Sequence, residues 1–576
     1  MTMRPLLIAL PAALVLSGCA TLEKPGEPAL SPPQAQARTG AVSAADPRAQ
    51  AAGEAILAKG GNATDAAIAV MLALTVVEPQ SSGIGGGGFL VHGSADGTVV
   101  TFDGRETAPA AAGPNWFLGK EGDPLSYREV VTTGLSVGVP GNIALAAKAH
   151  AANGSLAWEE LFQPAIVLAR DGFLANRRLH QSLEGQIDRA GVTEFGRSLY
   201  YTADGAPVAA GTRIVNPALA ETLERIAALG PDHFYKGQYA DKLAATVAAA
   251  TPGGIGMTRD DVTSYEAPMR NAVCGSYRDY RICGMGPPSS GGIAVIQILG
   301  QLERFDLAAL GADNPVTWHL FVESQRLAYA DRELYAADAD FVSVPVRGLV
   351  ARDYLAERSA LISPDTALDD VAAGRPRGVV TVASDGDEPP ENGTSHFAVV
   401  DAEGAMVSYT STIEGPFGSG LTYGGFFLNN ELTDFSFSPM RDGVPVANRV
   451  EGGKRPRSSM APMVVYDPQG EPVLAIGAAG GSTIPVQTAR SIIGIIDFGL
   501  DIEDALGLPF IMAFGDRLLL EESSWLADRK AAFAALGHDD IATASPPLKA
   551  GGVYRTQTGW VAARDPRLDG LLETQE

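Results

Sequence analysis

Alternating apolar positions on both sides of a short turn predict a hairpin in the last third of the chain. The first strand follows Thr394 and ends near Val400, and the turn Asp401-Ala402-Glu403-Gly404 leads into a second strand over residues 405–410. The polar residues before Thr394 end abruptly at the first apolar position. Thr394 therefore lies at the mouth of a strand.

Thr394 fits two roles. A β-branched side chain is typical of the start of a strand. A threonine hydroxyl is also a nucleophile when a base lies beside it, and a threonine that becomes the first residue of a chain supplies its own α-amine as that base. This second role requires cleavage between Gly393 and Thr394, where a residue without Cβ tolerates the distorted backbone that cleavage needs. The residues alone leave both roles open.

Helical patterns precede this hairpin. A proline after Asp46 predicts the start of a helix that ends at Gly60-Gly61, and Asn62 or Thr64 then caps a second helix that runs to about Val77. The second helix is apolar on all sides, which predicts that it is buried. A third, polar-faced helix is expected over residues 321–337.

A glycine-rich segment, residues 83–88, matches the G-x-G-x-x-G spacing of dinucleotide-binding loops. Such a loop must open a helix, whereas residues 89–92 and 99–103 have the pattern of two strands around a turn. We therefore expect no dinucleotide, and expect the glycines to let the backbone pass close to other strands. No group of cysteines and histidines has metal-site spacing, so neither a cofactor nor a metal is predicted.

Cys274 and Cys283 flank a predicted turn at Arg278-Asp279. In a hairpin around that turn the two cysteines lie opposite each other, within the distance that a disulfide spans. An oxidising compartment would permit the bond; two small buried apolar residues are the alternative. A cross-strand disulfide is our hypothesis.

Composition indicates a globular protein. The 576 residues are 46% apolar and 19% charged, which is ample for a large buried core. No long low-complexity linker divides the chain after residue 45, so one large composite domain fits the length as well as several smaller ones. The formal net charge of −24 repels phosphate backbones, and nucleic-acid binding is not expected.

The first residues are built like a secretory signal. Arg4 precedes an apolar run over residues 5–16 that is too short to span a bilayer. The run ends in Leu16-Ser17-Gly18-Cys19, which resembles a bacterial lipobox and implies a signal peptide over residues 1–18.

The lipobox resemblance implies lipid attachment at Cys19, with plain secretion as the alternative. Ala20 follows the cysteine, which in such lipoproteins implies sorting to the outer membrane. The expected location is therefore the bacterial periplasm, with membrane contact through the lipid anchor alone. Residues 19–45, rich in Pro, Ala, Ser and Gln, are predicted to form a flexible tether.

Several separated motifs resemble those of the γ-glutamyltransferases, members of the N-terminal-nucleophile hydrolases, in the order that the family has them. The resemblance extends from about Asp46 to near the C-terminus. The motifs are Gly85-Gly86-Gly87-Gly88-Phe89, Arg105-Glu106, Pro287-Pro288-Ser289-Ser290-Gly291-Gly292, Thr394-Ser395-His396, Thr412, Asn429-Asn430-Glu431, Asp434-Phe435-Ser436, Arg457-Ser458-Ser459-Met460 and Gly480-Gly481.

This resemblance implies an α+β fold, the αββα sandwich of two antiparallel sheets between helical layers. It also implies that one precursor cleaves itself between Gly393 and Thr394. The expected products are a large subunit, residues 46–393, and a small catalytic subunit, residues 394–576, which stay associated.

The resemblance further implies a role for each motif. Thr394 attacks the γ-carbonyl of a γ-glutamyl compound such as glutathione, and water or the amine of an amino acid or peptide resolves the acyl-enzyme. The other residues assist the nucleophile (Thr412), stabilise the oxyanion (Gly480, Gly481), bind the substrate α-carboxylate (Arg105, Ser458, Ser459) or hold its α-ammonium group (Glu431, Asp434).

The chemistry of these residue types agrees with such roles. A guanidinium fork suits bidentate binding of a carboxylate. Gly480-Gly481 lies between a predicted strand, residues 473–476, and a predicted helix, residues 484–498, for which Ser482 is a candidate cap. Backbone N–H groups at such a junction point toward one spot of positive potential, which is the form of an oxyanion hole.

Two departures from the family pattern concern specificity. Glu414 stands two residues after Thr412, where the family commonly has Asn, and a carboxylate there repels a substrate carboxylate and attracts an amine or another acyl group. The segment 437–450, where the family carries a lid, is short, which favours hydrolysis over transfer because water has access.

Two other functions remain open at this point. One is a related amide hydrolase, similar to cephalosporin acylase, with the same nucleophile and a different acyl pocket. The other is a catalytically silent envelope lipoprotein that binds a partner and stays uncleaved. The joint presence of Thr394, Thr412 and Gly480-Gly481 favours an enzyme.

Overall fold

The computed structural model describes residues 1–2, 39–380, 384, 393–546 and 548–574. The chain separates into two units, Met1–Arg38 and Thr39–Glu576. Most of the predicted signal peptide, Cys19 and most of the tether lie outside the described residues. The tether prediction is wrong at its C-terminal end, because Ala41–Ala44 forms strand β1. Its small apolar side chains are buried in the second unit, a contact that a solvated tether does not make.

The first of two large sheets contains the predicted hairpin. Its six strands are antiparallel throughout and follow the order β1-β9-β10-β2-β3-β6. The predicted hairpin over residues 89–103 is confirmed, and the strand after the Asp401–Gly404 turn extends farther than predicted, to Thr412. The strand bounds are β1 (Ala41–Ala44), β9 (Ser395–Val400), β10 (Met406–Thr412), β2 (Gly87–Gly93), β3 (Val99–Asp103) and β6 (Met269–Asn271).

The second large sheet is also antiparallel, in the order β21-β20-β16-β15-β8-β7. It faces the first sheet, as the Ser408 hydroxyl in β10 donates to the Ile476 carbonyl in β16 at 3.0 Å. The strands are β21 (Gly559–Arg564), β20 (Lys549–Thr556), β16 (Pro472–Ala479), β15 (Met463–Tyr466), β8 (Tyr280–Gly284) and β7 (Val273–Tyr277).

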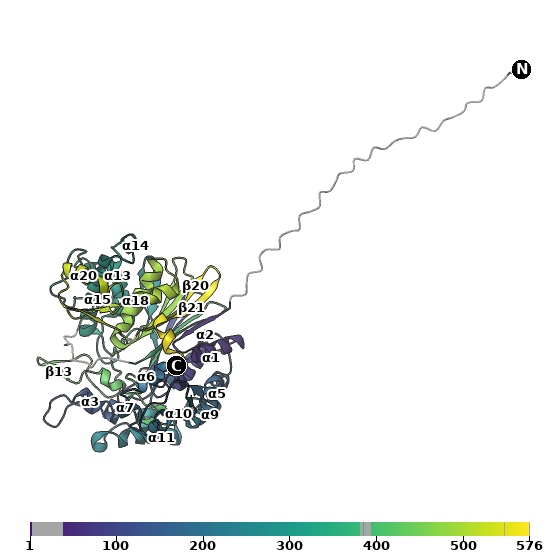
Figure 1. The fold of residues 1–576 in the computed structure, drawn as a ribbon, viewed down its shortest axis with the longest axis vertical. Helices are drawn as coiled ribbons and strands as arrows, with labels where there is room; N and C mark the ends of the chain where they lie inside the picture. Colours follow the sequence, from purple (N-terminus) through teal and green to yellow (C-terminus); the bar gives the residue numbers. More distant parts are fainter. Residues whose placement is uncertain (3–38, 381–383, 385–392, 547, 575–576) are drawn as a thin grey trace. The chain divides into compact units, whose positions relative to one another are not determined.

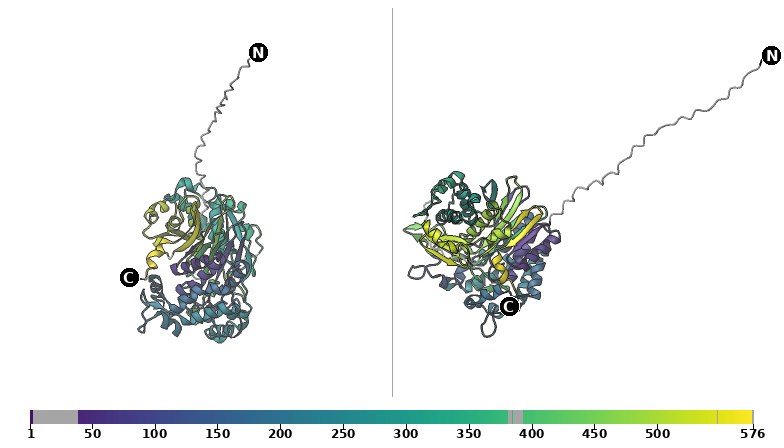
Figure 2. Two further views of the ribbon diagram at one scale, coloured as in Figure 1. Left: turned by 90° about the vertical axis from the view of Figure 1, so that its right-hand side faces the viewer. Right: turned by 45° about the horizontal axis from the view of Figure 1, so that its top comes forward.

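Helices cover the outer face of each sheet (Figure 1), and the turned views show α1 and α2, in purple, close to the strands (Figure 2). The layers are therefore helix, sheet, sheet, helix, as the αββα expectation requires. Against the first sheet lie α1 (Pro47–Ala58), α2 (Ala63–Val77) and α4 (Asn142–Asn153), and α5 (Gln163–Asp171) and α9 (Pro217–Leu229) pack outside α2. Against the second sheet lie α13 (Gly291–Leu302) and α18 (Ile484–Ile496), and α15 (Pro315–Tyr335) packs on α13.

Smaller elements complete the described unit. A three-stranded sheet is formed by β17 (Ile511–Phe514), β18 (Arg517–Glu521) and β19 (Ile541–Ala544). The remaining helices of at least five residues are α6 (Arg177–Leu183), α8 (Glu194–Tyr200), α11 (Gly237–Ala249), α12 (Arg259–Thr263), α17 (Arg352–Ser359), α19 (Ile502–Gly507) and α20 (Lys530–Ala535). No helix of the described residues is both long and apolar enough to cross a membrane.

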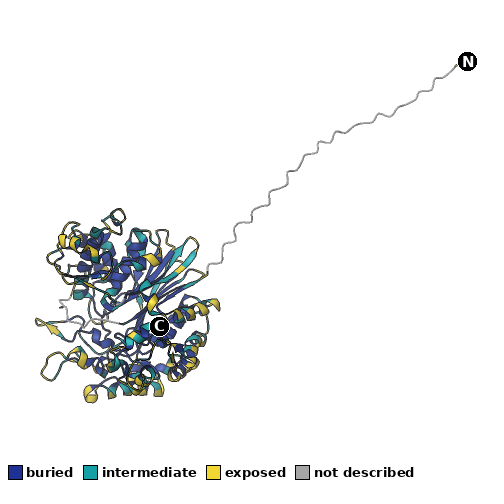
Figure 3. Cartoon of the chain, in the orientation of Figure 1, coloured by how far each residue is buried: buried dark blue, intermediate teal, exposed yellow. Residues whose placement is uncertain are grey.

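Helix α2 shows how local sequence and tertiary burial agree. The Asn62 side chain accepts hydrogen bonds from Thr64 N and Asp65 N, and the Asp65 carboxylate accepts one from Asn62 N, which completes a capping box. All fifteen helical residues are buried, as the all-round apolar pattern predicted. Figure 3 shows dark blue, buried positions along the sheets and inner helices, with yellow, exposed positions on the outer helices and loops.

Two helix predictions need correction at their starts. Helix α15 begins six residues earlier than predicted, at Pro315, because the Asn314 side chain caps it by accepting from Val316 N. Ser482 does not cap α18; a 3-10 turn, Gly481–Thr483, precedes that helix, and Thr483 occupies the N-cap position without a side-chain cap.

The glycine-rich segment leads into a strand, β2, and not into a helix, as predicted. A Cβ on Gly85 would lie 2.0 Å from the Phe427 carbonyl oxygen, and one on Gly86 would lie 2.0 Å from that of Thr412. The glycines therefore admit neighbouring backbone, and one of these neighbours is the end of β10.

The hairpin of β7 and β8 brings Cys274 opposite Cys283, and a disulfide joins them. Arg278 and Asp279 form the turn with φ values of 49° and 66°. Such left-handed pairs are typical of tight hairpin turns, because their twist matches that of the strands. The pairing is the one that the turn position predicted.

Removing the disulfide tests its contribution to stability. We expect Cys274→Ala/Cys283→Ala to lower the free energy of unfolding by about 2–3 kcal/mol, because the bond closes a short loop in the unfolded chain. Chemical denaturation of the oxidised protein and the double variant measures the difference. A reductant should lower the free energy of unfolding of the parent and leave that of the double variant unchanged. Labelling of both cysteine thiols in the denatured, unreduced parent would show that the disulfide is absent.

Candidate active site

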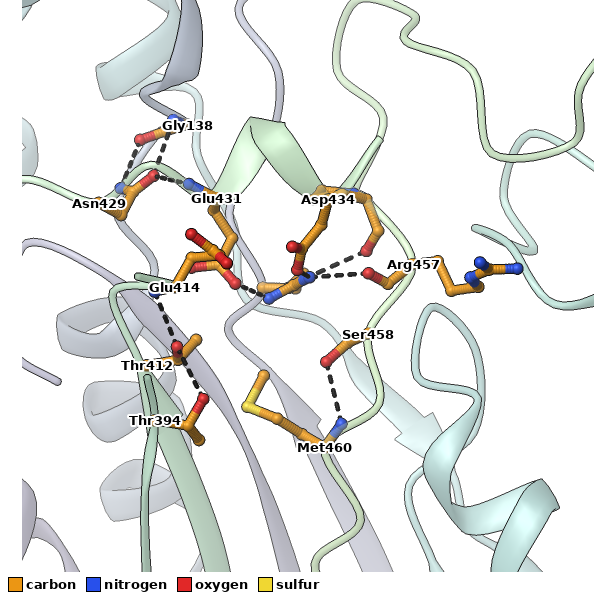
Figure 4. A network of polar contacts seen from close by, with 12 residues as sticks. Gly138, Thr394, Thr412, Glu414, Asn429, Glu431, Asp434, Arg457, Ser458 and Met460 are labelled. Carbon is orange, nitrogen blue, oxygen red and sulfur yellow. Dashed lines mark hydrogen bonds and ion pairs between the residues drawn. The ribbon is translucent and has the colours of Figure 1, made fainter. Parts of the chain in front are cut away.

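Thr394 directly precedes β9, beside the last residue of β10. The antiparallel register pairs Ser395 with Ser411, which brings Thr394 next to Thr412. The Thr394 hydroxyl donates to Thr412 Oγ1 at 3.1 Å, and Thr412 Oγ1 also accepts from Glu414 N at 2.8 Å (Figure 4). The nucleophile candidate is therefore held in one orientation by a buried neighbour, and its own exposed fraction is 5%.

Three residues around Thr394 have left-handed backbone conformations, and two of them carry a Cβ. Gly393, Thr394 and Glu414 have φ values of 102°, 84° and 70°. For a residue with a Cβ this region costs about 1–3 kcal/mol. A Cβ on Gly393 would lie 1.7 Å from the Glu414 carbonyl oxygen, so only glycine fits before Thr394.

Arg105 forms the charged end of the site. Its guanidinium pairs with Glu431, and with Asp434 at 2.5 Å. It also donates to the carbonyl oxygens of Pro456 at 3.2 Å and Arg457 at 2.8 Å. The side chain is 1% exposed, so these contacts replace its hydration shell.

Glu106 is a buried carboxyl next to this ion-pair cluster. Burial raises its pKa well above the usual range, and the charge of Glu431 raises it further. Both effects favour the protonated form of Glu106. The carboxylates that balance Arg105 are Glu431 and Asp434, and the next acidic group toward Thr394 is Glu414.

Glu414 lies between Thr412 and the charged end. Its carboxylate accepts a hydrogen bond from the Asn430 side-chain amide, and Asn430 Oδ1 in turn accepts from Arg189 at 3.2 Å. Glu414 is 4% exposed. The arrangement fixes a carboxylate inside the site through Asn430.

The Gly480-Gly481 pair lies at the end of β16, where the chain turns into the 3-10 turn before α18. The φ values are 129° and 59°, which residues with a Cβ rarely adopt. At the start of such a turn the first N–H groups lack intrahelical partners and can face an anion. The Tyr329 hydroxyl donates to the Ser482 carbonyl and braces this junction against α15.

A pocket gathers eight of the predicted residues. Its free volume is only about 10 Å³, room for about one water molecule, because Arg105 and the carboxylates fill it by pairing with one another. The lining residues are Arg105, Thr394, Thr412, Glu414, Glu431, Asp434, Ser458, Met460, Gly481 and Ile484.

The other predicted residues flank this pocket. Gly393 and Gly480 are the chain neighbours of lining residues, and Ser459 follows Ser458. The Ser459 hydroxyl accepts from Arg332 at 2.6 Å, while Ser458 Oγ accepts from Met460 N at 3.2 Å. Ser459 thus connects the pocket wall to α15.

A larger cleft of about 650 Å³ lies on the α15 side of the site. Arg457 and Ser482 line it, and each is the chain neighbour of a pocket residue. Its walls combine apolar and charged side chains, among them Tyr329, Met512, Phe514, Arg332 and Glu333.

Four polar residues at the site gave no signal in the sequence. Ser81 O accepts from Thr394 N at 3.1 Å, Lys549 Nζ donates to Thr394 O, and Arg178 pairs with Glu78 beside them. These residues come from separate segments, and each stands in an ordinary local pattern. Only the fold brings them to Thr394.

One group of described residues has the spacing of metal ligands: His319, Glu323 and His538. His319 Nδ1 already shares a hydrogen bond of 2.8 Å with His538 Nε2, and its Nε2 bonds Ser363 O at 2.9 Å. The Glu323 carboxylate accepts from Leu368 N at 2.7 Å. Protein partners thus occupy the atoms that face one another.

Known proteins resemble the chain over most of its length. The family model for gamma-glutamyltranspeptidase matches residues 49–574. The glutathione hydrolase proenzyme of Bacillus subtilis (strain 168) is 37% identical over 485 residues, which cover 82% of this chain and 80% of that relative. The acylase ACY 1 proenzyme of Pseudomonas sp. (strain SE83) is 35% identical over 517 residues, 88% of each chain.

The fold has solved counterparts as well. The structure of cephalosporin acylase from Bacillus halodurans aligns with a TM-score of 0.77 at 26% identity, covering 95% of this chain and 98% of that chain. This agreement confirms the fold of the N-terminal-nucleophile hydrolases. With the matching family model and the relatives above 30% identity, the chain belongs to the gamma-glutamyltranspeptidase family.

Proposed function

We propose that this protein is a self-processing γ-glutamyltransferase and glutathione hydrolase whose nucleophile is Thr394. One observation carries the proposal. The Thr394 hydroxyl is hydrogen-bonded to Thr412, in a pocket with a buried guanidinium at its far end, and Thr394 directly follows a glycine that no other residue can replace.

This geometry supports self-cleavage as the first step of the proposal. Thr394 Oγ attacks the Gly393 carbonyl carbon, the Gly393–Thr394 C–N bond breaks, and the hydroxyl proton passes to the departing nitrogen. Water then hydrolyses the Gly393 ester, which restores the hydroxyl and leaves a free α-amine on Thr394. Backbone strain at Thr394 favours this step, because scission of the Gly393–Thr394 bond removes its left-handed φ. Residues up to Gly393 form the large subunit, and residues from Thr394 form the small subunit.

The same hydroxyl then attacks the substrate amide. The Thr394 α-amine accepts the hydroxyl proton and delivers it to the leaving amine, so that the acyl group remains as an ester on Thr394. The N–H groups at Gly480 and Gly481 stabilise the oxyanion. Water or an acceptor amine attacks the ester and regenerates the hydroxyl.

The charged end suits the α-amino acid group of a γ-glutamyl donor. A bound ammonium group takes the carboxylates of Glu431 and Asp434, and a bound carboxylate takes the Arg105 guanidinium with Ser458 and Ser459. Each buried charge then exchanges one partner for another, so no charge is left uncompensated. Opening the pocket requires Arg105 to separate from its present partners.

A second candidate is an amide hydrolase with a different acyl pocket. Glu414 favours it, because this buried carboxylate lines the pocket between Thr394 and Arg105 and disfavours a second carboxylate there. The similarity to an acylase supports it, as does the 650 Å³ cleft, which has room for a bulky leaving amine. The third candidate, a silent binding protein, requires an intact chain.

We also propose that the enzyme acts in the periplasm, anchored to the outer membrane through a lipid on Cys19. Residues 16–19 carry this proposal by sequence alone. No nucleic-acid partner is proposed, because the net charge is −24.

Mass and activity together test the main proposal. We expect the purified protein to consist of two fragments, the smaller beginning at Thr394, and to hydrolyse a γ-glutamyl anilide. Thr394→Ala should remain a single chain without activity, and Thr394→Ser is the matched control because it keeps a hydroxyl. A parent that consists of two fragments and cleaves a glutaryl anilide but not the γ-glutamyl anilide would support the acylase candidate. An uncleaved, inactive parent would contradict both enzyme candidates.

Glu414 is the position to change for specificity. We expect Glu414→Asn to raise kcat/KM for the γ-glutamyl anilide about tenfold, the equivalent of ~1.4 kcal/mol, because repulsion of the substrate carboxylate is removed. Asparagine also tolerates the left-handed φ at this position. Glu414→Gln separates the effect of charge from that of side-chain length. A loss of γ-glutamyl activity in both variants would show that the carboxylate binds the donor.

A further inference from the structure

Lys549 is a buried cation at the first position of β20, with an exposed fraction of 9%. Its Nζ donates to the Thr394 carbonyl oxygen and to Ser81 Oγ, the latter at 3.3 Å. Among the described residues, no carboxylate lies within ion-pair distance of this ammonium group. Burying a cation without a counter-ion costs several kcal/mol of folding free energy, which indicates that the lysine has a role at this position.

Lys549 belongs to a closed set of contacts around the Thr394 main chain. Thr394 N donates to Ser81 O at 3.1 Å, and the Ser81 hydroxyl accepts from both Lys549 and Arg178 Nη2, the latter at 3.2 Å. Arg178 pairs with Glu78, which also accepts from the Ser395 hydroxyl. The N–H and the carbonyl oxygen of Thr394 are thus both held.

The charges that face this set do not neutralise Lys549. On the Lys549 side of Thr394, Glu78 is paired with Arg178, and the other acidic neighbour of Arg178 is Asp46. His396 in β9 is neutral, because burial lowers its pKa to about 3. On the pocket side the charged residues are Arg105, Glu414, Glu431 and Asp434.

Cleavage before Thr394 would place a second amine beside Lys549, among the contacts of Ser81. The Thr394 nitrogen that now donates to Ser81 O becomes the α-amine, while Lys549 stays bonded to the hydroxyl of the same serine. Two ammonium groups this close repel each other, so the pair loses its first proton at a lower pH than either amine alone. The unprotonated α-amine is the form that accepts the Thr394 hydroxyl proton.

We propose that Lys549 is a positioning residue that holds the Thr394 main chain and, after cleavage, keeps the Thr394 α-amine unprotonated near neutral pH. The proposal rests on the proposed function and deepens it. Burial and the charge of Arg178 lower the pKa of Lys549 as well.

The pH dependence of the processed enzyme tests this role. Without Lys549 the α-amine keeps its proton to a higher pH, so the acidic limb of kcat/KM should move upward by about 1–2 pH units in Lys549→Met and Lys549→Gln. Lys549→Gln retains a donor for the Thr394 carbonyl, and Lys549→Arg retains the charge. The arginine variant should keep the limb near that of the parent.

Intact mass separates this proposal from the function on which it rests. A parent chain not cut before Thr394 would remove the proposed function, whereas a cut, active parent leaves Lys549 to be judged alone. If Lys549→Met or Lys549→Gln is cleaved before Thr394 and the acidic limb of its kcat/KM profile stays at the pH of the parent, the proposal is wrong. This holds even where the variant has a lower kcat or melting temperature. Failure of both neutral variants to mature while Lys549→Arg matures would also overturn it and assign the lysine to cleavage.

Discussion

The antiparallel register between β9 and β10 is the constraint on which the site depends. It brings the residue before one strand beside the last residue of the other, so that two threonine hydroxyls eighteen positions apart lie 3.1 Å apart. A shift of one residue would turn every side chain of the strand to its other face. The register is held because both faces of these strands are buried between α2 and the second sheet.

Burial then decides the electrostatics of the site. Arg105, Glu414, Glu431 and Lys549 are nearly inaccessible to water, so each charge is governed by its protein neighbours. At the charged end a guanidinium meets two carboxylates, and a substrate with both charges can exchange places with them. Behind Thr394, Lys549 donates to the Thr394 carbonyl oxygen, and no carboxylate of the described residues lies within ion-pair distance of its ammonium group.

The family includes relatives named as glutathione hydrolases and as acylases, and the differences that matter can be small. Here Thr394, the proposed nucleophile, lines one pocket together with Thr412, Gly481 and Glu414. Glu414 is held by Asn430, so its effect on specificity depends on a hydrogen bond as well as a charge. The cleft beside α15 lies next to this pocket, and the proposed reaction would place its amine product there.

Local patterns in the sequence determined the buried helix after Asn62, the hairpins on either side of Asp401 and Arg278, and, through family motifs, the residues of the pocket. These features depend on neighbours in the chain, whose periodicity and turn chemistry are visible in one sequence. Strand β1, the early start of α15, and the contacts of Lys549, Ser81 and Arg178 with Thr394 depended on the tertiary structure. They join segments up to several hundred residues apart, and only packing of the two sheets decides which of many ordinary side chains meet.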